Sequence, residues 1–236
     1  MSRRDELAEG LAATRSRLDA ACRAAGRDRT EVALLPVTKF FPASDIALLQ
    51  ELGCTDFGEN REQEAAAKAA ELTGARLHML GHIQRNKAKS VARWAAMVHS
   101  LDSIRLAGAL ERSTEAALEA GVRAAPLDVL IQISLDGDPA RGGVTRADLA
   151  ALVETVAQSP SLRLRGVMGV PPLEADPERA FTELAELWTD VRRDHPDADV
   201  FSAGMSGDLE LAVKLGSTCV RVGTAILGRR PLTSLP

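Results

Sequence analysis

Aromatic residues are scarce in this sequence, which contains no tyrosine and draws only 3% of its 236 residues from phenylalanine and tryptophan. A chain of this length can bury a sizeable core, and with so few rings that core must be mainly aliphatic. The absence of tyrosine also removes the phenol group from the side chains that could act as a general acid or base.

Neither sign of charge dominates, because 29 Lys and Arg residues face 33 Asp and Glu residues that are mixed along the chain. The basic stripe typical of nucleic-acid binding is therefore missing. No apolar run approaches the roughly 20 residues that cross a bilayer. The N-terminal segment is charged and lacks the apolar region and cleavage site of a signal peptide. We expect a cytoplasmic protein that binds neither nucleic acid nor a membrane.

Cysteine is rare, with Cys22, Cys54 and Cys219 far apart in the chain and odd in number. Their positions fit no metal-ligand spacing, so no metal site is predicted. We interpret the three thiols as small, reduced core residues rather than as disulfide or reactive groups.

Short apolar segments alternate with helix-like segments along the whole chain. The predicted strands are residues 32–38, 54–60, 76–81, 97–103, 127–135, 162–170, 199–205 and 219–226. Alternation of strand and helix indicates parallel pairing, and apolar strands indicate a sheet that is covered on both faces. Eight such units without a linker predict an α/β fold, a single (β/α)₈ barrel domain over residues 1–236.

An open, doubly wound sheet is the alternative architecture. No G-x-G-x-x-G motif follows the first predicted strand, which disfavours a dinucleotide-binding sheet of that kind. Only residues 227–236 follow the last predicted strand, so we expect no second, C-terminal domain.

Polar or small residues follow the apolar runs at the predicted C-terminal strand ends, where barrels place their chemistry. They are Lys39, Glu59, Asn60, Gly81, His82, Ser100, Ser134, Met168, Ser202, Met205, Arg221, Gly223 and Thr224. We therefore expect a binding pocket at this end of the barrel.

Lys39 stands out because it ends the apolar run VALLPVTKFFP. Burying an ammonium group is costly unless it is paired or neutral. A neutral amine is a nucleophile for an aldehyde. The alternatives are a lysine that reaches the rim, or one that pairs with Glu59 or Asp56.

The last two units carry glycine-rich turns. SAGMSGDLELA places Gly204, Ser206 and Gly207 at a predicted helix start, and RVGTA adds Gly223 and Thr224. Free N–H groups at such a place suit a phosphate, although the glycines could simply make turns and Ser206 could simply cap a helix. Strands 1 and 8 are neighbours in a closed barrel, so the lysine and these turns together indicate an aldehyde that carries a phosphate. Pyridoxal 5′-phosphate (PLP) has both groups.

Motifs over nearly the whole chain resemble the pyridoxal phosphate homeostasis protein family (the YggS/PROSC type). They are VTKFFP, DFGENREQE, LHMLGHIQRNK, HSLDS, QISLDGDPARGGV, LRGVMGV, SAGMSGDLELAVKLGS and RVGTAILG. The resemblance implies a barrel like the N-terminal barrel of alanine racemase (PLP fold type III) without its C-terminal β domain.

The resemblance also implies roles for single residues. Lys39 falls where the family forms a Schiff base with PLP, and Arg221 matches the arginine that approaches the pyridine nitrogen. The remaining cofactor-binding candidates are Asn60, Ser202, Met205, Ser206, Gly223 and Thr224. The sequence departs from the family pattern at Arg61, Val144 and Ala203. None of these is the lysine or a phosphate-binding residue, so the departures bear on the shape of the pocket more than on cofactor binding.

The residue at the ring nitrogen bears on activity. A permanently charged guanidinium keeps the nitrogen unprotonated and weakens the ring as an electron sink. Racemisation needs two bases; Lys39 could be one, and the tyrosine of the alanine racemase pattern is absent. His82 could substitute, or it could serve as a capping or hydrogen-bonding residue, whereas His78 and His99 are expected to be structural.

These points favour a PLP-binding protein over a PLP enzyme. The resemblance implies a non-catalytic carrier or buffer that controls free PLP, and we expect a monomer whose partners include PLP-dependent apo-enzymes. The loop from Gly137 to Gly143 could cover the pocket or be an ordinary barrel loop. The alternatives for function are a PLP-dependent amino-acid racemase and a Schiff-base aldolase that acts on a phosphorylated sugar without PLP.

Overall fold

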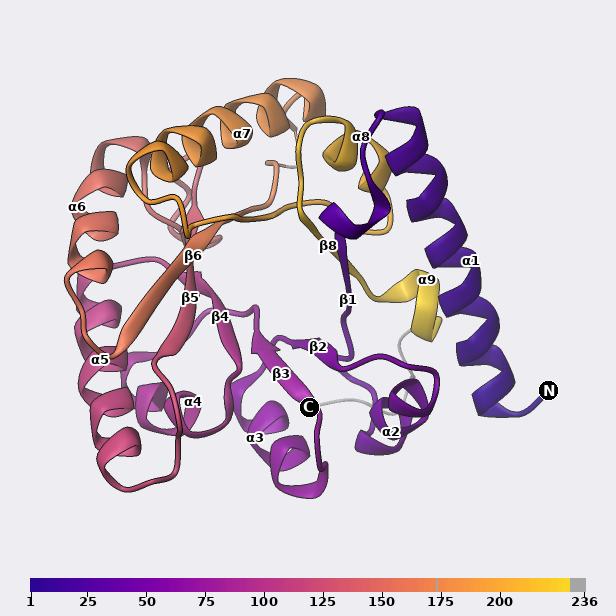
Figure 1. Ribbon diagram of the computed structural model, residues 1–236, viewed down its shortest axis with the longest axis horizontal. Coiled ribbons are helices and arrows are strands. Elements are labelled where there is room, and N and C mark those ends of the chain that lie inside the picture. The colour runs from indigo at the N-terminus through magenta and orange to yellow at the C-terminus, as the bar shows by residue number, and fades with distance from the viewer. Residues whose placement is uncertain (173, 230–236) are drawn as a thin grey trace.

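The computed structural model describes residues 1–172 and 174–229. Eight parallel strands form one sheet in the order β1-β8-β7-β6-β5-β4-β3-β2. A parallel bridge between Val37 and Gly58, with a hydrogen bond from the Thr38 N–H to the Gly58 carbonyl, joins the two end strands. The sheet therefore closes into a barrel with helices around it (Figure 1), and the predicted (β/α)₈ fold is confirmed over the open-sheet alternative.

Every predicted strand contains an observed one, although the observed strands are shorter. They are β1 (Ala33–Pro36), β2 (Asp56–Glu59), β3 (Arg76–Met79), β4 (Met97–Leu101), β5 (Leu127–Ile133), β6 (Leu162–Gly169), β7 (Val200–Ser202) and β8 (Cys219–Val222). The predicted ends of the last two strands were wrong. Gly204 has a φ of 92°, which ends β7 early, and the Gly223 carbonyl accepts hydrogen bonds from Ile226 and Leu227, which starts a helical turn after β8.

The helices lie outside the barrel, as Figure 1 shows. They are α1 (Arg3–Ala24), α2 (Ala43–Glu51), α3 (Glu62–Glu71), α4 (Ala88–Trp94), α5 (Ile104–Glu119), α6 (Arg146–Ala157), α7 (Pro177–Asp194), α8 (Leu209–Lys214) and α9 (Thr224–Leu227), with 3₁₀ turns η1 (Arg29–Glu31) and η2 (Arg85–Lys87). Capping residues explain several starts: the Ser2, Ser103 and Asp176 side chains accept from the first turns of α1, α5 and α7.

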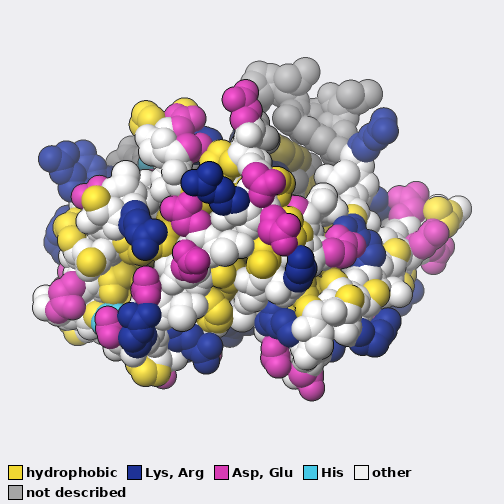
Figure 2. Space-filling model, turned by 90° about the horizontal axis from the view of Figure 1, so that it is seen from above, with side chains coloured by type: hydrophobic (Ala, Val, Ile, Leu, Met, Phe, Trp, Pro, Cys, Tyr) yellow, Lys and Arg dark blue, Asp and Glu magenta, His cyan; other side chains and the backbone are white. Residues whose placement is uncertain are grey.

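The core is mainly aliphatic, as the composition predicts, and its few rings include Trp188 stacked on Phe201. Cys22 and Cys219 are buried, Cys54 is half-buried, and all three thiols are free. Within the described residues, no helix is both long and apolar enough to cross a membrane. Acidic and basic side chains intermingle on the face shown in Figure 2, in line with the mixed charge of the sequence.

Candidate functional site

A cavity of about 400 Å³ opens at the C-terminal ends of the strands, within the size range of ligand pockets. It is lined by Val37, Lys39, Asn60, Leu80, Met168, Val170, Met205, Ser206, Gly207, Arg221, Gly223 and Thr224. All of the predicted cofactor-binding residues line it except Ser202, which is fully buried; of the other strand-end candidates only Met168 lines it. Strand register explains part of this convergence: Pro36 pairs with Val222, so the chain leaving β1 runs beside Gly223.

Lys39 does not end a buried strand, and that expectation was wrong. Strand β1 stops at Pro36, and Lys39 lies in the following turn with a half-buried side chain. Its Nζ lies 5.8 Å from the centroid of the Phe40 ring. The partners considered for it are engaged elsewhere: Glu59 accepts from Lys68, and Asp56 pairs with His78 and Arg76. The amine is therefore exposed to the cavity rather than held by a carboxylate.

Arg221 forms the floor of the cavity. Its Nη1 donates to the Ser202 hydroxyl at 2.7 Å and its Nη2 donates to the Gly169 carbonyl at 3.1 Å. The side chain is nearly inaccessible to solvent, and burial lowers its pKa from the very high ordinary value of a guanidinium. Because that value is so high, the guanidinium still carries its charge at neutral pH.

A chain of hydrogen bonds runs from Arg221 through the barrel interior. The Ser202 hydroxyl lies 3.0 Å from His99 Nδ1, His99 Nε2 lies 3.0 Å from His78 Nδ1, and His78 Nε2 lies 2.9 Å from Asp56 Oδ1. Burial, reinforced by the nearby charge of Arg221, lowers the pKa of His99 well below 6.5, so its ring is neutral at pH 7. Burial also disfavours ionised Asp56, but hydrogen bonds from His78, Thr55 and Arg76 outweigh it and lower the pKa of that carboxyl.

The two ends of this hydrogen-bond series fix its direction, because the Arg221 guanidinium can only donate and the Asp56 carboxylate can only accept. The Ser202 hydroxyl therefore accepts from Arg221 and donates its own proton to His99 Nδ1. His99 then carries its proton on Nε2 and donates to His78, which in turn donates to the Asp56 carboxylate. The sequence predicted structural histidines here, but it gave no sign that they support Arg221.

The other side of the cavity offers unpaired backbone donors. Within the described chain, the N–H groups of Ser206, Gly207 and Gly223 have no hydrogen-bond acceptor. A Cβ at Gly223 would lie 3.2 Å from the Val37 carbonyl oxygen, so glycine allows β8 to pass close to the end of β1. The helix α8 begins at Leu209, close to where the sequence predicts it, but Ser206 does not cap it; Asp208 is the N-cap residue, and its side chain accepts from the Met205 N–H at 2.5 Å.

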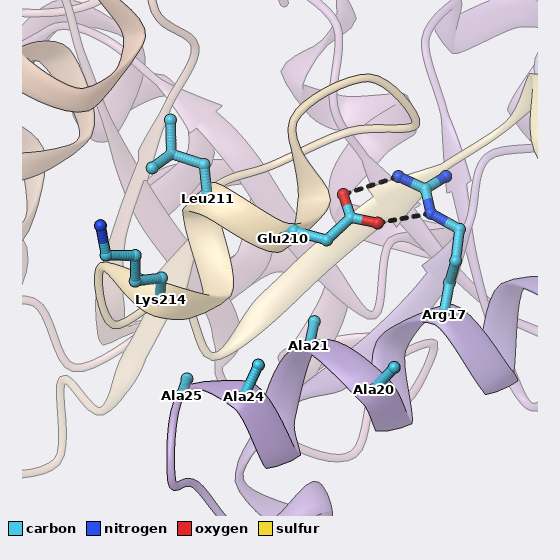
Figure 3. Close-up of a pocket in the computed structure, with 8 residues that line it drawn as sticks. All are labelled: Arg17, Ala20, Ala21, Ala24, Ala25, Glu210, Leu211 and Lys214. Carbon is cyan, nitrogen blue, oxygen red and sulfur yellow. Dashed lines mark hydrogen bonds and ion pairs between the residues drawn. The ribbon is translucent and has the colours of Figure 1, made fainter.

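Arg17 of α1 links this loop to the outer helix layer, because it donates to the Ser206 carbonyl at 3.0 Å. It also binds both carboxylate oxygens of Glu210 on α8 at 2.7 Å (Figure 3). The hollow beside this pair has a floor of small α1 side chains, including Ala20 and Ala24. Sequence reasoning missed Arg17, because nothing in a helical pattern indicates contact with a loop so far along the chain.

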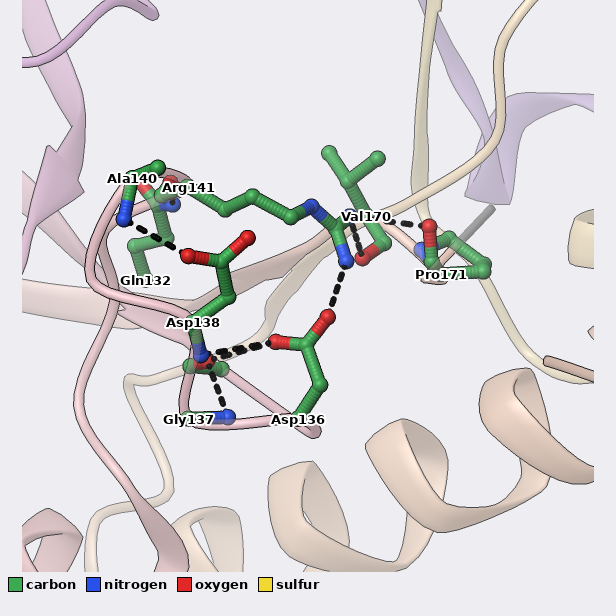
Figure 4. A network of polar contacts seen from close by, with 9 residues as sticks. Gln132, Asp136, Gly137, Asp138, Ala140, Arg141, Val170 and Pro171 are labelled. Carbon is green, nitrogen blue, oxygen red and sulfur yellow. Dashed lines mark hydrogen bonds and ion pairs between the residues drawn. The ribbon is translucent and has the colours of Figure 1, made fainter. Parts of the chain in front are cut away.

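The loop from Gly137 to Gly143 does not line the cavity. Figure 4 shows how Arg141 holds this loop. It binds Asp136 at 2.7 Å and donates to the Val170 and Pro171 carbonyls at 2.9 Å each. Two of its residues, Arg141 and Gly142, line a separate hollow of about 200 Å³. The loop is thus anchored to the end of β6 beside the candidate site.

His82 lies in the exposed region next to the cavity rather than in it. Its Nδ1 is 3.2 Å from Asp102 Oδ2, and 67% of its side chain is exposed. It lines a neighbouring hollow that also contains Asn60. Among residues 1–172 and 174–229, no group of three or more acidic, histidine or cysteine side chains could hold a metal ion.

Comparison with known proteins identifies the family of this chain. Residues 11–231 match the model of the alanine racemase N-terminal domain. The pyridoxal phosphate homeostasis protein of Mycobacterium leprae is 51% identical over 246 residues, covering 98% of this chain and 96% of the relative. The protein of the same name from Escherichia coli K12 is 37% identical, covering 96% of this chain and 97% of its own length.

Solved structures agree with this placement. PipY of Synechococcus elongatus PCC7942, solved with PLP bound, superposes with a TM-score of 0.79 at 33% identity, covering 94% of this chain and all of PipY. Alanine racemase from Corynebacterium glutamicum shares the fold, with a TM-score of 0.70 at 16% identity, and the match covers 99% of this chain and 63% of the racemase. The chain therefore belongs to the pyridoxal phosphate homeostasis protein family, built on the barrel of the alanine racemase N-terminal domain.

Proposed function

We propose that this protein binds PLP covalently through Lys39 and serves in PLP homeostasis as a carrier or buffer, without catalytic turnover. One observation carries the proposal: the Lys39 amine and the unpaired N–H groups of Ser206, Gly207 and Gly223 open onto the same cavity. An amine and a cluster of free N–H donors match the aldehyde and the phosphate of PLP. The PLP-bound structure of PipY supports the choice of ligand.

When bound, PLP supplies an aldehyde that an amine can hold covalently and release again. Lys39 would provide the amine, and the loops at Ser206 and Gly223 would bind the phosphate together with the Thr224 hydroxyl. Arg221, held in place by the Ser202 hydroxyl, would interact with the ring nitrogen, and Asn60 and Met205 would contact the rest of the ligand. Because Asn60, Met205 and Thr224 are exposed, the ligand would lie near solvent, which suits a protein that must release it.

The same residues argue against turnover. The buried guanidinium of Arg221 acts as a donor and keeps the ring nitrogen unprotonated. A racemase also needs a second base opposite Lys39. His82 is the candidate for it, but its ring is exposed, contacts Asp102 and lines a different hollow.

Mixing the protein with PLP tests the proposal. We expect a visible absorption band that survives dialysis, and we expect it to be lost in Lys39→Ala while the fold, followed by circular dichroism, is kept. A band retained by Lys39→Ala would move the site to another lysine. A protein that PLP never colours would favour the aldolase alternative.

Incubation of the PLP-loaded protein with amino acids in deuterated water tests for turnover. We expect no rapid exchange at Cα. Exchange with inversion that is lost in Lys39→Ala would favour the racemase alternative.

We further propose that the chain acts as one barrel domain and as a monomer in the cytoplasm, and that it hands PLP to PLP-dependent apo-enzymes. The three free thiols suit a reducing compartment. Light scattering coupled to gel filtration tests the monomer. Activation of an apo-transaminase by the loaded protein, at a rate above that of spontaneous PLP release, tests direct transfer.

A further inference from the structure

A second lysine lies beneath the turn that carries Lys39. Lys68, on α3, is only 5% exposed. Its ammonium group donates to the Thr38 carbonyl at 3.0 Å, to Glu59 Oε1 at 2.7 Å and to Glu64 Oε1 at 2.8 Å. An ammonium group has three donors, so these three acceptors use all of them and fix its position.

The partners of Lys68 hold the chain on both sides of Lys39. On one side, the Thr38 hydroxyl donates to Glu59 Oε1 at 2.6 Å, and the Thr38 carbonyl accepts from Lys68. On the other side, the Phe40 N–H donates to Glu64 Oε1 at 2.7 Å. The residue that we propose as the PLP-binding lysine therefore sits between two residues tied to one ammonium–carboxylate cluster.

This turn has a backbone conformation that needs support. Phe40 has a φ of 71°, and it is the one residue other than glycine with a positive φ among the described residues. A bulky side chain disfavours that region. The bond from the Phe40 N–H to Glu64 holds the residue there, and Lys68 in turn holds Glu64.

Charge balance makes the cluster depend on Lys68. Glu59 is fully buried, and its Oε2 has no hydrogen-bond partner within the described chain. A buried carboxylate needs a counter-charge, and Lys68 supplies it. Lys68 itself does not line the cavity, so it cannot contact the ligand directly.

We propose that Lys68 is a positioning residue for Lys39: it fixes the turn of residues 38–40 so that the Lys39 amine is presented to the aldehyde. This inference rests on the proposed function, in which Lys39 holds PLP. This role differs from a purely structural one, because it affects covalent capture of the aldehyde and leaves the proposed phosphate-binding loops after β7 and β8 unaffected.

The experiment separates covalent capture from non-covalent binding. Lys68→Met is mixed with PLP and the rate of capture is followed by absorbance. Binding of pyridoxine 5′-phosphate, which has the ring and the phosphate but an alcohol in place of the aldehyde, is measured by calorimetry. We expect capture to slow by about tenfold and the Kd for pyridoxine 5′-phosphate to stay within about twofold.

Lys87→Met is the matched control, because Lys87 is also ion-paired, with Glu62 at 3.4 Å, but within the described residues its side chain forms no hydrogen bond or ion pair with Thr38, Glu59 or Glu64. It should capture PLP at the rate of the unaltered protein. Capture at that rate by a folded Lys68→Met would overturn the inference. An equal loss of capture and of pyridoxine 5′-phosphate binding would also overturn it, since that pattern means general damage to the site.

Glu64→Ala keeps the test decisive if Lys68→Met does not fold. It removes the acceptor of the Phe40 N–H and leaves the pair between Lys68 and Glu59 in place. We expect slower capture with unchanged pyridoxine 5′-phosphate binding, and unchanged capture would contradict the inference. Lys39→Ala distinguishes the two proposals: capture that persists in it refutes the proposed function, whatever Lys68→Met does.

Discussion

Arg221 and His99 share one hydroxyl group, that of Ser202. The Arg221 guanidinium donates to this oxygen at 2.7 Å, and the oxygen lies 3.0 Å from His99 Nδ1. The cavity floor is therefore connected through His99 and His78 to Asp56, the first residue of β2. This connection makes the orientation of Arg221 depend on groups that never reach the cavity.

Ser202→Ala should disturb Arg221 without removing it. The change leaves Arg221 and His99 each short of a buried partner, so we expect a loss of about 1–3 kcal/mol in the free energy of unfolding. The absorption band of the PLP-loaded protein should also shift, because Arg221 is less firmly held. Urea unfolding and visible spectra measure the two effects.

Ser100→Ala is the control for that variant. Ser100 is equally buried and donates to the Gly81 carbonyl at 2.7 Å, but it does not contact Arg221. It should lower stability and leave the band in place. Equal spectral shifts in the two variants would show that the link to Arg221 has no special effect.

The buried, neutral His99 predicts a pH dependence of stability. Burial lowers the pKa of His99 in the folded protein, whereas in the unfolded chain this pKa is near 6.5. Below that pH the unfolded chain therefore binds a proton at His99 that the folded protein does not bind. The free energy of unfolding should therefore fall as pH drops below that value, with a limiting slope of about 1.4 kcal/mol per pH unit.

His99→Gln should remove this contribution. Other groups also change the free energy of unfolding with pH. The raised pKa of buried Glu59 makes the folded protein more stable as pH drops toward 4.5, which opposes the effect of His99. The lowered pKa of Asp56 makes the folded protein less stable only as pH drops below 3.8. The difference between variant and unaltered protein isolates His99, measured by urea unfolding between about pH 5 and 7. Parallel stability curves would mean that His99 is not the group responsible.

Arg17→Met should weaken PLP binding from outside the cavity, because it frees the Ser206 carbonyl and Glu210. An exposed pair of this kind contributes at most about 1 kcal/mol, so we expect stability to change little and the Kd for PLP to rise by about threefold. Arg4→Met removes another α1 ion pair, with Glu51, far from the loop, and should leave the Kd unchanged. Equal affinities for both variants would remove Arg17 from the account.

Gly223→Ala should lower both stability and PLP affinity. The added methyl group would meet the Val37 carbonyl oxygen at 3.2 Å, where β1 and β8 pass closest to the cavity. We expect a destabilisation of about 1–3 kcal/mol from this overpacking, measured by urea unfolding. Gly207→Ala, with nothing within 4 Å of the new Cβ, should leave stability unchanged. A similar loss in both variants would show that crowding at Val37 is not the cause.

The sequence predicts the barrel well because alternating apolar strands and amphipathic helices are local patterns. It also brings the site residues together, since parallel strands share one edge in a closed barrel. The strand ends at Lys39 and after Val222 were wrong, because an apolar run such as VALLPVTKFFP does not reveal where strand gives way to turn.

The supporting contacts could not be predicted in the same way. Lys68 appears in the sequence as one polar residue of an alanine-rich helix, and only the fold shows that it is buried beneath Thr38. Likewise, His99 and Ser202 are 103 residues apart and Arg17 and Ser206 are 189 residues apart. Such pairs are set by how helices and strands pack, and no local pattern encodes them.

Borohydride reduction of the PLP-treated protein, followed by peptide mass spectrometry, tests the central claim most directly, because it identifies the ligand and its site together. The account predicts one pyridoxyl phosphate group on the peptide that contains Lys39. A label on Lys68, Lys87 or Lys214 instead, or no label at all, would contradict it.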